Sequence, residues 1–539
     1  MRQKILGYDY VIVGGGSAGC LLANRLSKNP QIKVLLLEAG DSDDYFWIPI
    51  PVGYLYTIGN PRTDWCFKTE PDEGLNGRSL GYARGRVMGG CTSINAMIYM
   101  RGQRSDYDHW NALGNKGWSW DEVLPYFKGM EDYVHGSNEY HGHGGELPVQ
   151  ERRVNWEVLD AWRDAAAEVG IPKIKEFNTG DNFGNAYFQM NQRNGVRWNA
   201  VRAFLWPIKK RQNLTVMKNT HVERFILDTH NQKKRVIGVD CVEKNRGKFN
   251  VEIGSELILS AGSIGSPHIL ELSGVGDGEL SKRLGIPLIH KLDGVGKNLQ
   301  DHLQIRLQYK VKNTITLNDR VNSIAGKIKM GLEYFMFHTG PLTMPPSQLG
   351  AFAKSDESQN SANIEWHVQP LSLDKFGEPL HSFSAITPSV CNLRPTSRGQ
   401  VSAISLDPLE HPRIKMNYLS TTEDKNVAVN SIRLTRKIMK AKALEFFCPE
   451  EFQPGPSYET EKELISAAGD LGSTIFHPVG TCKMGSDKSA VVSDRLLVHG
   501  MENLRIIDAS VMPTITSGNT NAPTMMIAEK GAEFILQDR

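Results

Sequence analysis

The sequence predicts a fold in two parts, an α/β part and an α+β part, the second inserted into the first. A strand, a glycine turn, a helix and a second strand follow one another within residues 8–40. Strand-like runs then follow closely between residues 214 and 259. From residue 303 to 420 alternating strands predict a separate lobe. The chain of 539 residues suits several such units, because one domain usually takes about 150.

The first part begins with a βαβ unit. Tyr8–Val13 is a run of strand-forming residues that ends at three consecutive glycines, Gly14–Gly16. Ser17–Leu26 carries apolar residues at helical spacing, and Lys33–Leu37 is a second apolar run. Because neither run alternates with polar residues, we expect both strands to be buried on two faces, as in a parallel sheet.

The same patterns predict the remaining elements. Helices are expected at 120–130, 155–170, 198–212, 267–272, 423–445, 459–469 and 523–536. Strands are expected at 214–217, 222–228, 235–243, 248–259, 304–311, 363–368, 400–406 and 504–508. An apolar segment covers 328–352. We therefore predict a parallel-sheet domain assembled from residues 1–155, 195–302 and 470–539. A second domain of residues 156–194 and 303–469 is expected to be an antiparallel sheet covered by helices.

Composition excludes several classes of protein. With 40% hydrophobic and 23% charged residues the chain is ordinary globular material. A net charge of +2 gives no electrostatic footprint for nucleic acid. Seven scattered cysteines, none spaced C-x-x-C, predict neither a disulfide framework nor a zinc site. Asp9 and the glycines interrupt the apolar start too early for a signal peptide, and no run of 18 apolar residues occurs. We expect a cytoplasmic protein.

The glycine turn predicts a dinucleotide site. Gly14-x-Gly16-x-x-Gly19 follows a strand and opens a helix, and Glu38 ends the next strand. Gly14 permits the tight turn, Gly16 the approach of a pyrophosphate, and Gly19 close packing of helix on strand. A carboxylate at Glu38 would accept hydrogen bonds from ribose hydroxyls. A purely structural glycine turn is the alternative, and the motif alone does not separate FAD from NAD.

Further motifs resemble signatures of the glucose–methanol–choline (GMC) oxidoreductases, which are FAD-dependent. The first is GRVMGGCTSINAMIYMRG, which begins at Gly85. The others, in the family's order, are Gly262–Leu270 running on to Gly276, Gly294–His302, His477–Thr481, Asp508–Ser510 and Asn519–Pro523. Together with the glycine turn they extend from about residue 8 to residue 535. The chain is most similar in style to bacterial choline-dehydrogenase-like and alcohol-dehydrogenase-like members.

The resemblance implies a Rossmann-like FAD-binding domain. The positions expected to contact FAD are Gly14, Gly16, Ser17, Ala18, Gly19, Glu38, Ala39, Arg86, Val87, Gly89, Gly90, Thr92, Asn95, Ala96, Val222, Ala261, Asp508, Ala509, Asn519 and Thr520. Some relatives tether FAD through a histidine where this chain has Ile94. A hydrocarbon side chain has no nucleophilic atom, so we expect non-covalent FAD.

The resemblance also implies the chemistry, which is oxidation of a primary alcohol to an aldehyde. His477 matches the catalytic base, and Asn519 matches the second active-site position, with Asn521 close enough to be confused with it. His477 would take the hydroxyl proton while the α-carbon delivers hydride to flavin N5. Two alternatives stay open. One is a lyase, decarboxylase or light-driven flavoenzyme on the same fold, and the other is a nicotinamide-dependent dehydrogenase.

The second lobe is expected to roof the substrate site. Its candidate lining residues are Met344, Gln348, Phe352, Trp366, His367 and Arg394, of which Gln348, Phe352, Trp366 and Arg394 are our predicted substrate contacts. The neutral Gln348 disfavours choline, because a quaternary ammonium favours a carboxylate or an aromatic cage. Core packing is the alternative for each apolar candidate. No metal is expected.

The electron acceptor is expected to be a quinone, a dye-type acceptor or O2. A quinone would imply peripheral docking at the inner membrane face. Residues 324–337, with Lys327 and Lys329 among apolar residues, are a candidate contact, for which a buried helix is the favoured alternative. The sequence specifies neither the alcohol nor the oligomeric state.

Overall fold

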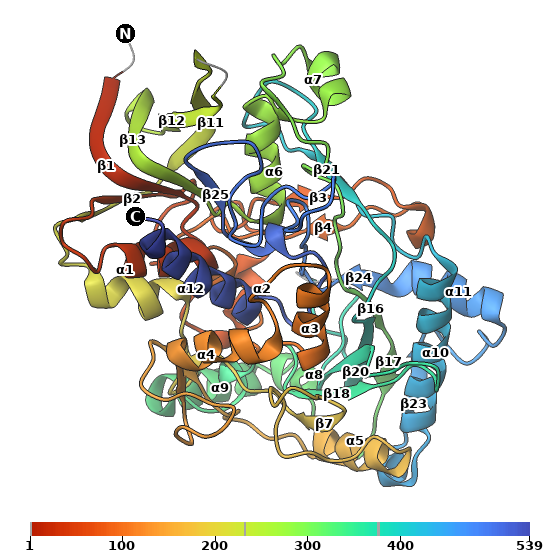
Figure 1. Ribbon diagram of the computed structural model, residues 1–539. Helices are drawn as coiled ribbons and strands as arrows, with labels where there is room; N and C mark the ends of the chain where they lie inside the picture. The colour runs from red at the N-terminus through yellow and green to blue at the C-terminus, as the bar shows by residue number, and fades with distance from the viewer. Residues whose placement is uncertain (1–2, 231–232, 375–377) are drawn as a thin grey trace.

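The structure is a computed structural model that describes residues 3–230, 233–374 and 378–539. Its two large sheets lie at opposite ends of the molecule, one at the upper left of Figure 1 and the other at the lower right. Both chain termini lie at the end with the first sheet (Figure 1). This arrangement confirms the predicted fold class, an α/β part joined to an α+β part.

The first sheet is parallel at its centre. Strands run in the order β10 (Leu214–Met217), β2 (Val34–Leu37), β1 (Gln3–Val13) and β13 (Gly247–Leu259), all parallel to their neighbours. All four residues of β2 are buried, as expected of a strand that is covered on both faces. The end of β13 also pairs in parallel with β25 (Leu504–Ile506).

An antiparallel extension completes this sheet. β13 pairs with β12 (Arg235–Glu243), which pairs with β11 (Thr220–Asp228). Hence the run of strands after residue 214 is one parallel strand followed by an antiparallel meander.

Helices cover this sheet and begin at its carboxyl edge. α1 (Ser17–Leu26) follows β1 and packs against α12 (Asn521–Gln537), although the two helices are far apart in sequence. α6 (Gly262–Leu272) follows β13 in the same way. On α12 pack α4 (Trp120–Met130) and, through it, α3 (Arg104–Ala112).

The second sheet is antiparallel. Its order is β23 (Glu450–Gln453), β17 (Gln308–Lys310), β20 (Ala385–Asn392), β19 (Ile364–Gln369), β18 (Leu349–Ala353) and β7 (Gly184–Tyr187). β16 (Leu303–Arg306) pairs with β20 and with β24 (Gly472–Thr474). The helices packed on this lobe are α5 (Glu157–Glu168), α10 (Thr422–Met439) and α11 (Glu461–Leu471).

The predicted domain limits remain a prediction, but sheet membership bears on one of them. β24 belongs to the second sheet, although the prediction assigns residues from 470 onward to the first domain. The remaining elements are short: α2 (Tyr54–Thr57), α7 (Gly278–Leu284), α8 (Leu317–Val321), β3 (Phe67–Lys68), β4 (Gly81–Tyr82), β5 (Glu131–Tyr133), β6 (Leu147–Val149), β8 (Gln192–Arg193), β9 (Val196–Arg197), β14 (Val275–Gly276), β15 (His290–Lys291), β21 (Gln400–Ser402) and β22 (Arg413–Lys415).

Two predicted elements differ from the structure. Residues 198–212 are not one α-helix but a π-helical turn, Val201–Leu205, followed by a 3₁₀ turn, Trp206–Ile208. Pro207 explains the break, since proline has no N–H to continue the helix and clashes with the preceding turn. The expected strand at 400–406 ends already at Ser402.

The apolar segment beginning near Ile328 divides into a helix and a strand. The helix is α9 (Ile324–Phe337), drawn at the lower left of Figure 1. A loop then leads into β18. None of the described helices combines the length and the apolar character needed to cross a bilayer.

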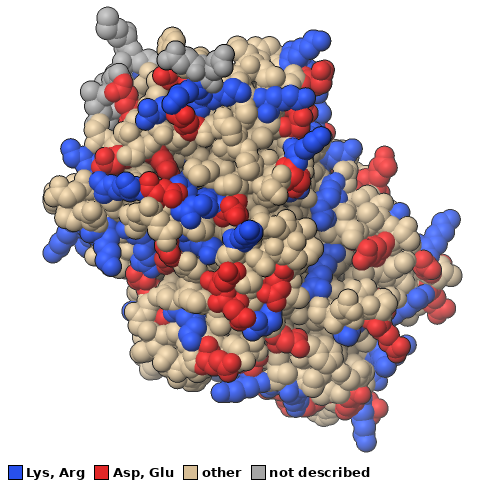
Figure 2. Space-filling model, in the orientation of Figure 1, with Lys and Arg blue, Asp and Glu red and all other residues tan. Residues whose placement is uncertain are grey.

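The face shown in Figure 2 carries basic and acidic side chains intermixed, without a large field of one sign. This distribution agrees with the near-zero net charge of +2.

Candidate active site

A long cavity connects the glycine turn of the first sheet with the strands of the second. At one end it is lined by Gly14 and Glu38, and at the other by Gln304 of β16 and His367 of β19. His477 lines the same cavity. We call this space the central cavity. Because both sheets contribute, neither lobe forms it alone.

The glycines of the turn occupy space that side chains would fill. Gly14 has a φ of +106°, and a Cβ there would collide with the carbonyl oxygen of Ser260. A Cβ on Gly19 would collide with the carbonyl oxygen of Gly14, so Gly19 serves helix–strand packing, as predicted. A Cβ on Gly90 would lie 2.8 Å from the Cα of Gly16. The turn therefore leaves bare backbone next to the cavity.

Three helix N-termini converge on the cavity. Ser17 opens α1, Gly262 opens α6 and Asn521 opens α12, and all three residues line the space. The Ser17 hydroxyl donates to the side-chain oxygen of Asn521 at 2.9 Å, which ties two of these N-termini together. Unsatisfied N–H groups and the positive ends of the helix dipoles favour an anion here. These residues fit the pyrophosphate of a dinucleotide.

Glu38 stands at the end of β2 beside this anion site. Its two carboxylate oxygens accept hydrogen bonds from the backbone N–H groups of Gly15 (2.8 Å) and Gly40 (2.7 Å). Burial raises the pKa of this carboxyl group to about 7, against the opposing effect of the two backbone donors. Its carboxylate keeps lone pairs free for ribose hydroxyls, because each oxygen accepts only one bond from the chain.

His477 and Asn519 meet at the other end of the cofactor region. His477 lies in the loop after β24, and Asn519 lies just before α12. The Asn519 side-chain nitrogen is 3.2 Å from His477 Nε2. The Asn519 side-chain oxygen is buried without a hydrogen-bond partner among the described residues. Buried polar atoms usually have partners, so this oxygen is open to a ligand.

A second histidine determines which nitrogen of His477 carries the proton. His302, just before β16, places Nε2 3.2 Å from the carbonyl oxygen of Leu393 and Nδ1 3.1 Å from His477 Nδ1. A carbonyl oxygen only accepts, so neutral His302 is protonated at Nε2 and accepts at Nδ1. His477 must then donate from Nδ1. Its Nε2 therefore carries the lone pair at the cavity, which accepts from the Asn519 amide at 3.2 Å in this structure and which a substrate hydroxyl would take over from that amide.

The environment keeps both imidazoles neutral. Burial lowers the pKa of His302 to about 3. The pKa of His477 lies well below its usual 6.5, first because of burial and then because of the nearby His302, His367 and Arg84. At neutral pH His477 is accordingly a free base rather than an imidazolium.

The backbone also holds His477 in place. Its N–H donates to the Asp301 carboxylate at 2.7 Å, and that carboxylate accepts from Thr474 and Tyr418 as well. Phe476 has a φ of +66°, in the left-handed region that a bulky residue rarely adopts. A strained backbone conformation of this kind persists only where surrounding hydrogen bonds and packing hold it in place. Such conformations are typical of functional sites.

The far end of the cavity differs from the substrate site that the sequence predicts. Of the six lining residues proposed from the sequence of the second lobe, only His367 lines the central cavity. Trp366 packs in the core on the other face of β19 and donates to Thr435 at 2.8 Å. Phe352 packs with Phe177 in a separate apolar cluster. The four predicted contacts, Gln348, Phe352, Trp366 and Arg394, therefore do not reach the cavity.

Strand geometry and local bonding explain this correction. Neighbouring residues of a strand point to opposite faces, so His367 faces the cavity while Trp366 faces away. The Gln348 amide bonds the carbonyl of Val154 at 3.3 Å, and Met344 is also part of the core. Arg394 bonds Ser361 at 2.6 Å, outside the cavity.

Residues without a sequence signal form the substrate end. They are Tyr54, Ile58, Gln304, Ser347 and Gln369. The Gln369 amide donates to the Ser347 hydroxyl at 3.2 Å, and its oxygen has no partner among the described residues. Alternation along β19 is the one signal that would have grouped Gln369 with His367.

Most predicted cofactor residues line the cavity. Those that do are Gly14, Gly16, Ser17, Ala18, Glu38, Ala39, Gly90, Asn95, Ala96, Val222, Ala261, Asp508, Ala509, Asn519 and Thr520. Those that lie behind this lining are Gly19, Arg86, Val87, Gly89 and Thr92. The second set supports the first. For example, Gly89 N–H donates to the carbonyl oxygen of Gly15, which lies between the lining residues Gly14 and Gly16. Ile94 lines the cavity as well.

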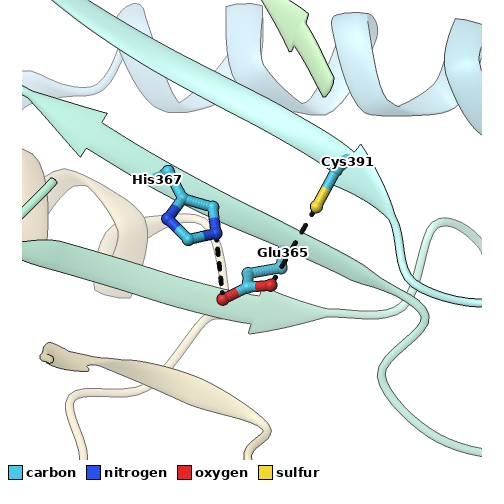
Figure 3. A group of neighbouring side chains, drawn as sticks. All are labelled: Glu365, His367 and Cys391. Atoms are coloured by element: carbon cyan, nitrogen blue, oxygen red, sulfur yellow. Dashed lines mark hydrogen bonds and ion pairs between the residues drawn. The ribbon is translucent and has the colours of Figure 1, made fainter. Parts of the chain in front are cut away.

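A buried group of possible metal ligands adjoins the cavity. Glu365 and His367 come from β19 and Cys391 from β20, and their ligand atoms lie within 4.8 Å of one another (Figure 3). Glu365 is 3.2 Å from His367 Nε2, and the Cys391 thiol donates to it at 4.0 Å. The carboxylate thus already joins the imidazole and the thiol. The predicted absence of a metal stays a prediction.

Comparison with known proteins agrees with this site. Models described as GMC oxidoreductase match residues 8–304 and 395–528. An alcohol dehydrogenase (acceptor) of Pseudomonas putida is 36% identical over 98% of this chain and 96% of its own. An oxygen-dependent choline dehydrogenase of Vibrio vulnificus is 38% identical over 98% and 94%. The solved structure of pyridoxine 4-oxidase from Mesorbium loti superposes with a TM-score of 0.88 at 30% identity, covering 98% of this chain and 99% of that one. The chain therefore belongs to the GMC oxidoreductases, a family of FAD-dependent enzymes.

Proposed function

We propose that this protein oxidises a primary alcohol to an aldehyde, with His477 as the base and FAD as the hydride acceptor. The observation that carries the proposal is the lone pair of His477 Nε2. It faces the central cavity, its tautomer follows from His302 and Leu393, and Asn519 lies beside it. An unprotonated imidazole in that place is suited to receive the proton of a hydroxyl group.

Each side chain has one task in the reaction. The alcohol hydroxyl donates to His477 Nε2, and its oxygen accepts from the Asn519 amide, so both groups hold the same atom. As the proton passes to His477, the amide stabilises the charge that develops on that oxygen. FAD, when bound, accepts the hydride that leaves the α-carbon. The alcohol thus loses one proton and one hydride and becomes the aldehyde.

The polar groups around the substrate end favour a neutral alcohol. Among the described cavity residues the carboxylates are Glu38, Asp508 and Glu410. Glu38 and Asp508 lie at the cofactor end. Glu410 belongs to the loop of residues 408–412. This loop is held against β11, because a ring nitrogen of His221 is hydrogen-bonded to the carbonyl oxygen of Pro408. No carboxylate of this described lining lies beside His477, and the buried Glu365 lies behind His367, with which it pairs at 3.2 Å. The lining itself therefore offers a quaternary ammonium group no direct counter-ion there. Similarity to choline dehydrogenases does not outweigh this difference.

An anaerobic titration tests the proposal. The purified protein is mixed without oxygen with choline, a medium-chain alkanol or a benzylic alcohol, and the flavin spectrum is recorded. We expect the neutral alcohols to bleach the oxidised flavin band and choline to do so least. A yellow protein that no alcohol bleaches would contradict the proposal and favour a non-redox flavoenzyme.

The acceptor for the electrons is proposed to be a quinone, a dye-type acceptor or O2. The printed names of the relatives include both an acceptor-linked and an oxygen-dependent dehydrogenase. Admitting air to the bleached protein distinguishes these cases. Return of colour within seconds indicates an oxidase, whereas slow return with rapid reoxidation by a quinone indicates a dehydrogenase. FAD is proposed to be non-covalent, so acid precipitation should release all yellow colour into the supernatant.

A further inference from the structure

Helix α9 exposes an apolar face where a surface helix normally exposes a polar one. Its outward residues are Ile324, Ile328, Leu332, Phe335 and Met336, which we call the α9 stripe. Each is at least 58% exposed, and Ile324 is 79% exposed. Their spacing of four, four, three and one residues places them on one side of the helix. The buried residues of the helix, Met330 and Tyr334, lie on the opposite side.

Neighbouring aromatic rings extend this surface beyond the helix. Phe46 is 57% exposed, and its ring centroid lies 6.5 Å from that of Phe335. Trp47, next in sequence, stacks on Tyr56, which is half exposed. A contiguous apolar surface of this kind on a globular protein marks a contact with a partner or with a membrane. Rings with a polar tip are typical of the boundary between water and lipid.

Charges flanking the stripe indicate the occupant. Lys327 and Lys329 are exposed on α9, and neither has an ion-pair partner among the described residues. The single acidic residue of the helix, Glu333, turns toward Thr339 and away from the outer stripe. Arg153 donates to the carbonyl oxygen of His338 at 2.8 Å, at the end where the helix stops. A convex apolar ridge edged by lysines complements an anionic bilayer, into which the ridge inserts while the ammonium groups stay at the headgroups.

We propose that the α9 stripe and Phe46 dock this protein on a lipid bilayer that contains anionic lipid. The helix has 14 residues and lies along the protein, so the contact is peripheral. A second copy of the chain fits the surface less well. Two such ridges facing each other would bring their unpaired lysines together without an acidic partner.

The docking surface is separated from the central cavity by a single buried layer. Tyr334, on the inner side of α9, packs in one cluster with Ile50, Val52 and Tyr54. Tyr54 and Ile58 in turn line the cavity. An apolar alcohol dissolved in the bilayer would therefore be held next to the wall of the substrate end. This last step, unlike the docking itself, rests on the proposed alcohol oxidation.

Vesicle co-sedimentation tests the docking without any assay of activity. The holoenzyme is mixed with vesicles of phosphatidylcholine, alone or with about 30% phosphatidylserine, and the sedimented fraction is measured. The stripe variant combines Ile328→Ser, Leu332→Ser and Phe335→Ser. Its matched control combines Leu288→Ser, Leu406→Ser and Phe446→Ser, three exposed apolar residues elsewhere on the surface.

We expect the wild type and the control to sediment with the anionic vesicles and the stripe variant to bind at least tenfold more weakly. Lys327→Gln with Lys329→Gln should weaken binding to anionic vesicles only and should reduce its dependence on salt. Wild-type protein that stays in the supernatant, or a stripe variant that binds like the wild type, would overturn the proposal. So would light scattering that shows a wild-type dimer and a monomeric stripe variant, since the stripe would then join two copies.

Activity on a short, water-soluble alcohol separates this proposal from the proposed function. Without vesicles the stripe variant should turn over such an alcohol like the wild type, because none of its three residues lines the cavity. A wild type that binds vesicles but oxidises no alcohol would leave the docking intact and refute the alcohol chemistry alone.

Discussion

The carbonyl oxygen of Leu393 determines, through two imidazoles, where the base of this site has its lone pair. His302 donates to that carbonyl from Nε2 and therefore accepts from His477 through Nδ1. His302 touches neither substrate nor cofactor in this account, and it acts as a positioning residue. The same relation between a histidine tautomer and its partner underlies catalytic triads.

Replacing His302 tests this chain of hydrogen bonds from Leu393 through His302 to His477. In His302→Leu no acceptor remains for His477 Nδ1–H, so we expect kcat to fall roughly 10- to 100-fold with little change in KM. In His302→Gln the side-chain oxygen accepts from His477 while the amide donates to Leu393, so most activity should return. Steady-state kinetics at equal FAD content gives the answer. Equal loss in both variants would indicate a merely structural role.

The pH dependence of the reaction follows from the burial of His477. A base works when it is unprotonated, and its pKa lies well below 6.5 here. Activity is therefore lost only when the pH falls through that lowered pKa. We expect kcat/KM to stay level from about pH 8 down past 6.5, the usual histidine pKa. An acid limb centred at or above pH 6.5 would contradict this assignment.

Motif matches predict the pair that we propose as catalytic, His477 and Asn519, but not its surroundings. Motif matches identify His477, Asn519 and most residues that line the cofactor region, because each motif lies within a short stretch of chain. No motif predicts the hydrogen bonds that join Leu393, His302 and His477, since these residues come from three separate segments of the chain. The four substrate candidates do not line the central cavity, and their role stays a prediction. For Trp366, side-chain type alone did not indicate which face of β19 points inward. Phe352 lies opposite Glu365, on the same face as His367, but packs against Phe177.

At the element scale, regular periodicity predicts structure well. α1 and α4 have the predicted ends, and β2 differs by one residue. Their apolar residues repeat at helical spacing or run continuously, and Ser119 with Glu122 forms a capping box at the start of α4. Prediction fails over residues 198–212, where Pro207 interrupts an otherwise helical pattern. For residues 324–337 the sequence left an amphipathic contact and a buried helix open and favoured the buried helix, since periodicity does not show which side faces the protein; the structure shows an exposed apolar face.

The close approach of two backbone turns makes a prediction at this scale. Gly90 has a φ of +51°, and a Cβ there would lie 2.8 Å from Gly16 Cα in the glycine turn. Gly90→Ala must move one turn away from the other, so we expect loss of most bound FAD, measured by the ratio of absorbance at about 450 nm to protein. Gly129→Ala is the control. It lies inside α4 with open space around it, so it should keep FAD and gain up to about 1 kcal/mol of stability.

The whole molecule encloses its site with segments that are distant in sequence. Residues 14, 16–18, 220–222, 260–265 and 508–509 line the cofactor end, while the second sheet closes the substrate end. Sequence reasoning predicted the inserted lobe from the change of pattern at residue 303. The extent of the cavity needed the structure, because it depends on how strands of two sheets face each other.

FAD bound among such segments should stabilise the entire fold. A ligand that binds only the folded state adds about 2.7 kcal/mol at a free concentration 100 times its Kd. We expect apo-protein to unfold at a lower temperature than holoenzyme, and the midpoint to rise with added FAD. NAD at the same concentration is the control and should have no effect. A midpoint that rises with NAD instead would favour the nicotinamide-dependent alternative.

In the proposed reaction His477 takes a proton while the α-carbon of an alcohol gives hydride to the flavin. Anaerobic rapid mixing of the holoenzyme with a benzylic alcohol, normal or deuterated at the α-carbon, measures this step as bleaching of the flavin. We expect slower bleaching with deuterium. We also expect a rate lower by roughly 10²- to 10⁴-fold in His477→Ala at unchanged FAD content. Bleaching as fast in His477→Ala as in the wild type, or no bleaching by any alcohol, would contradict the proposed reaction.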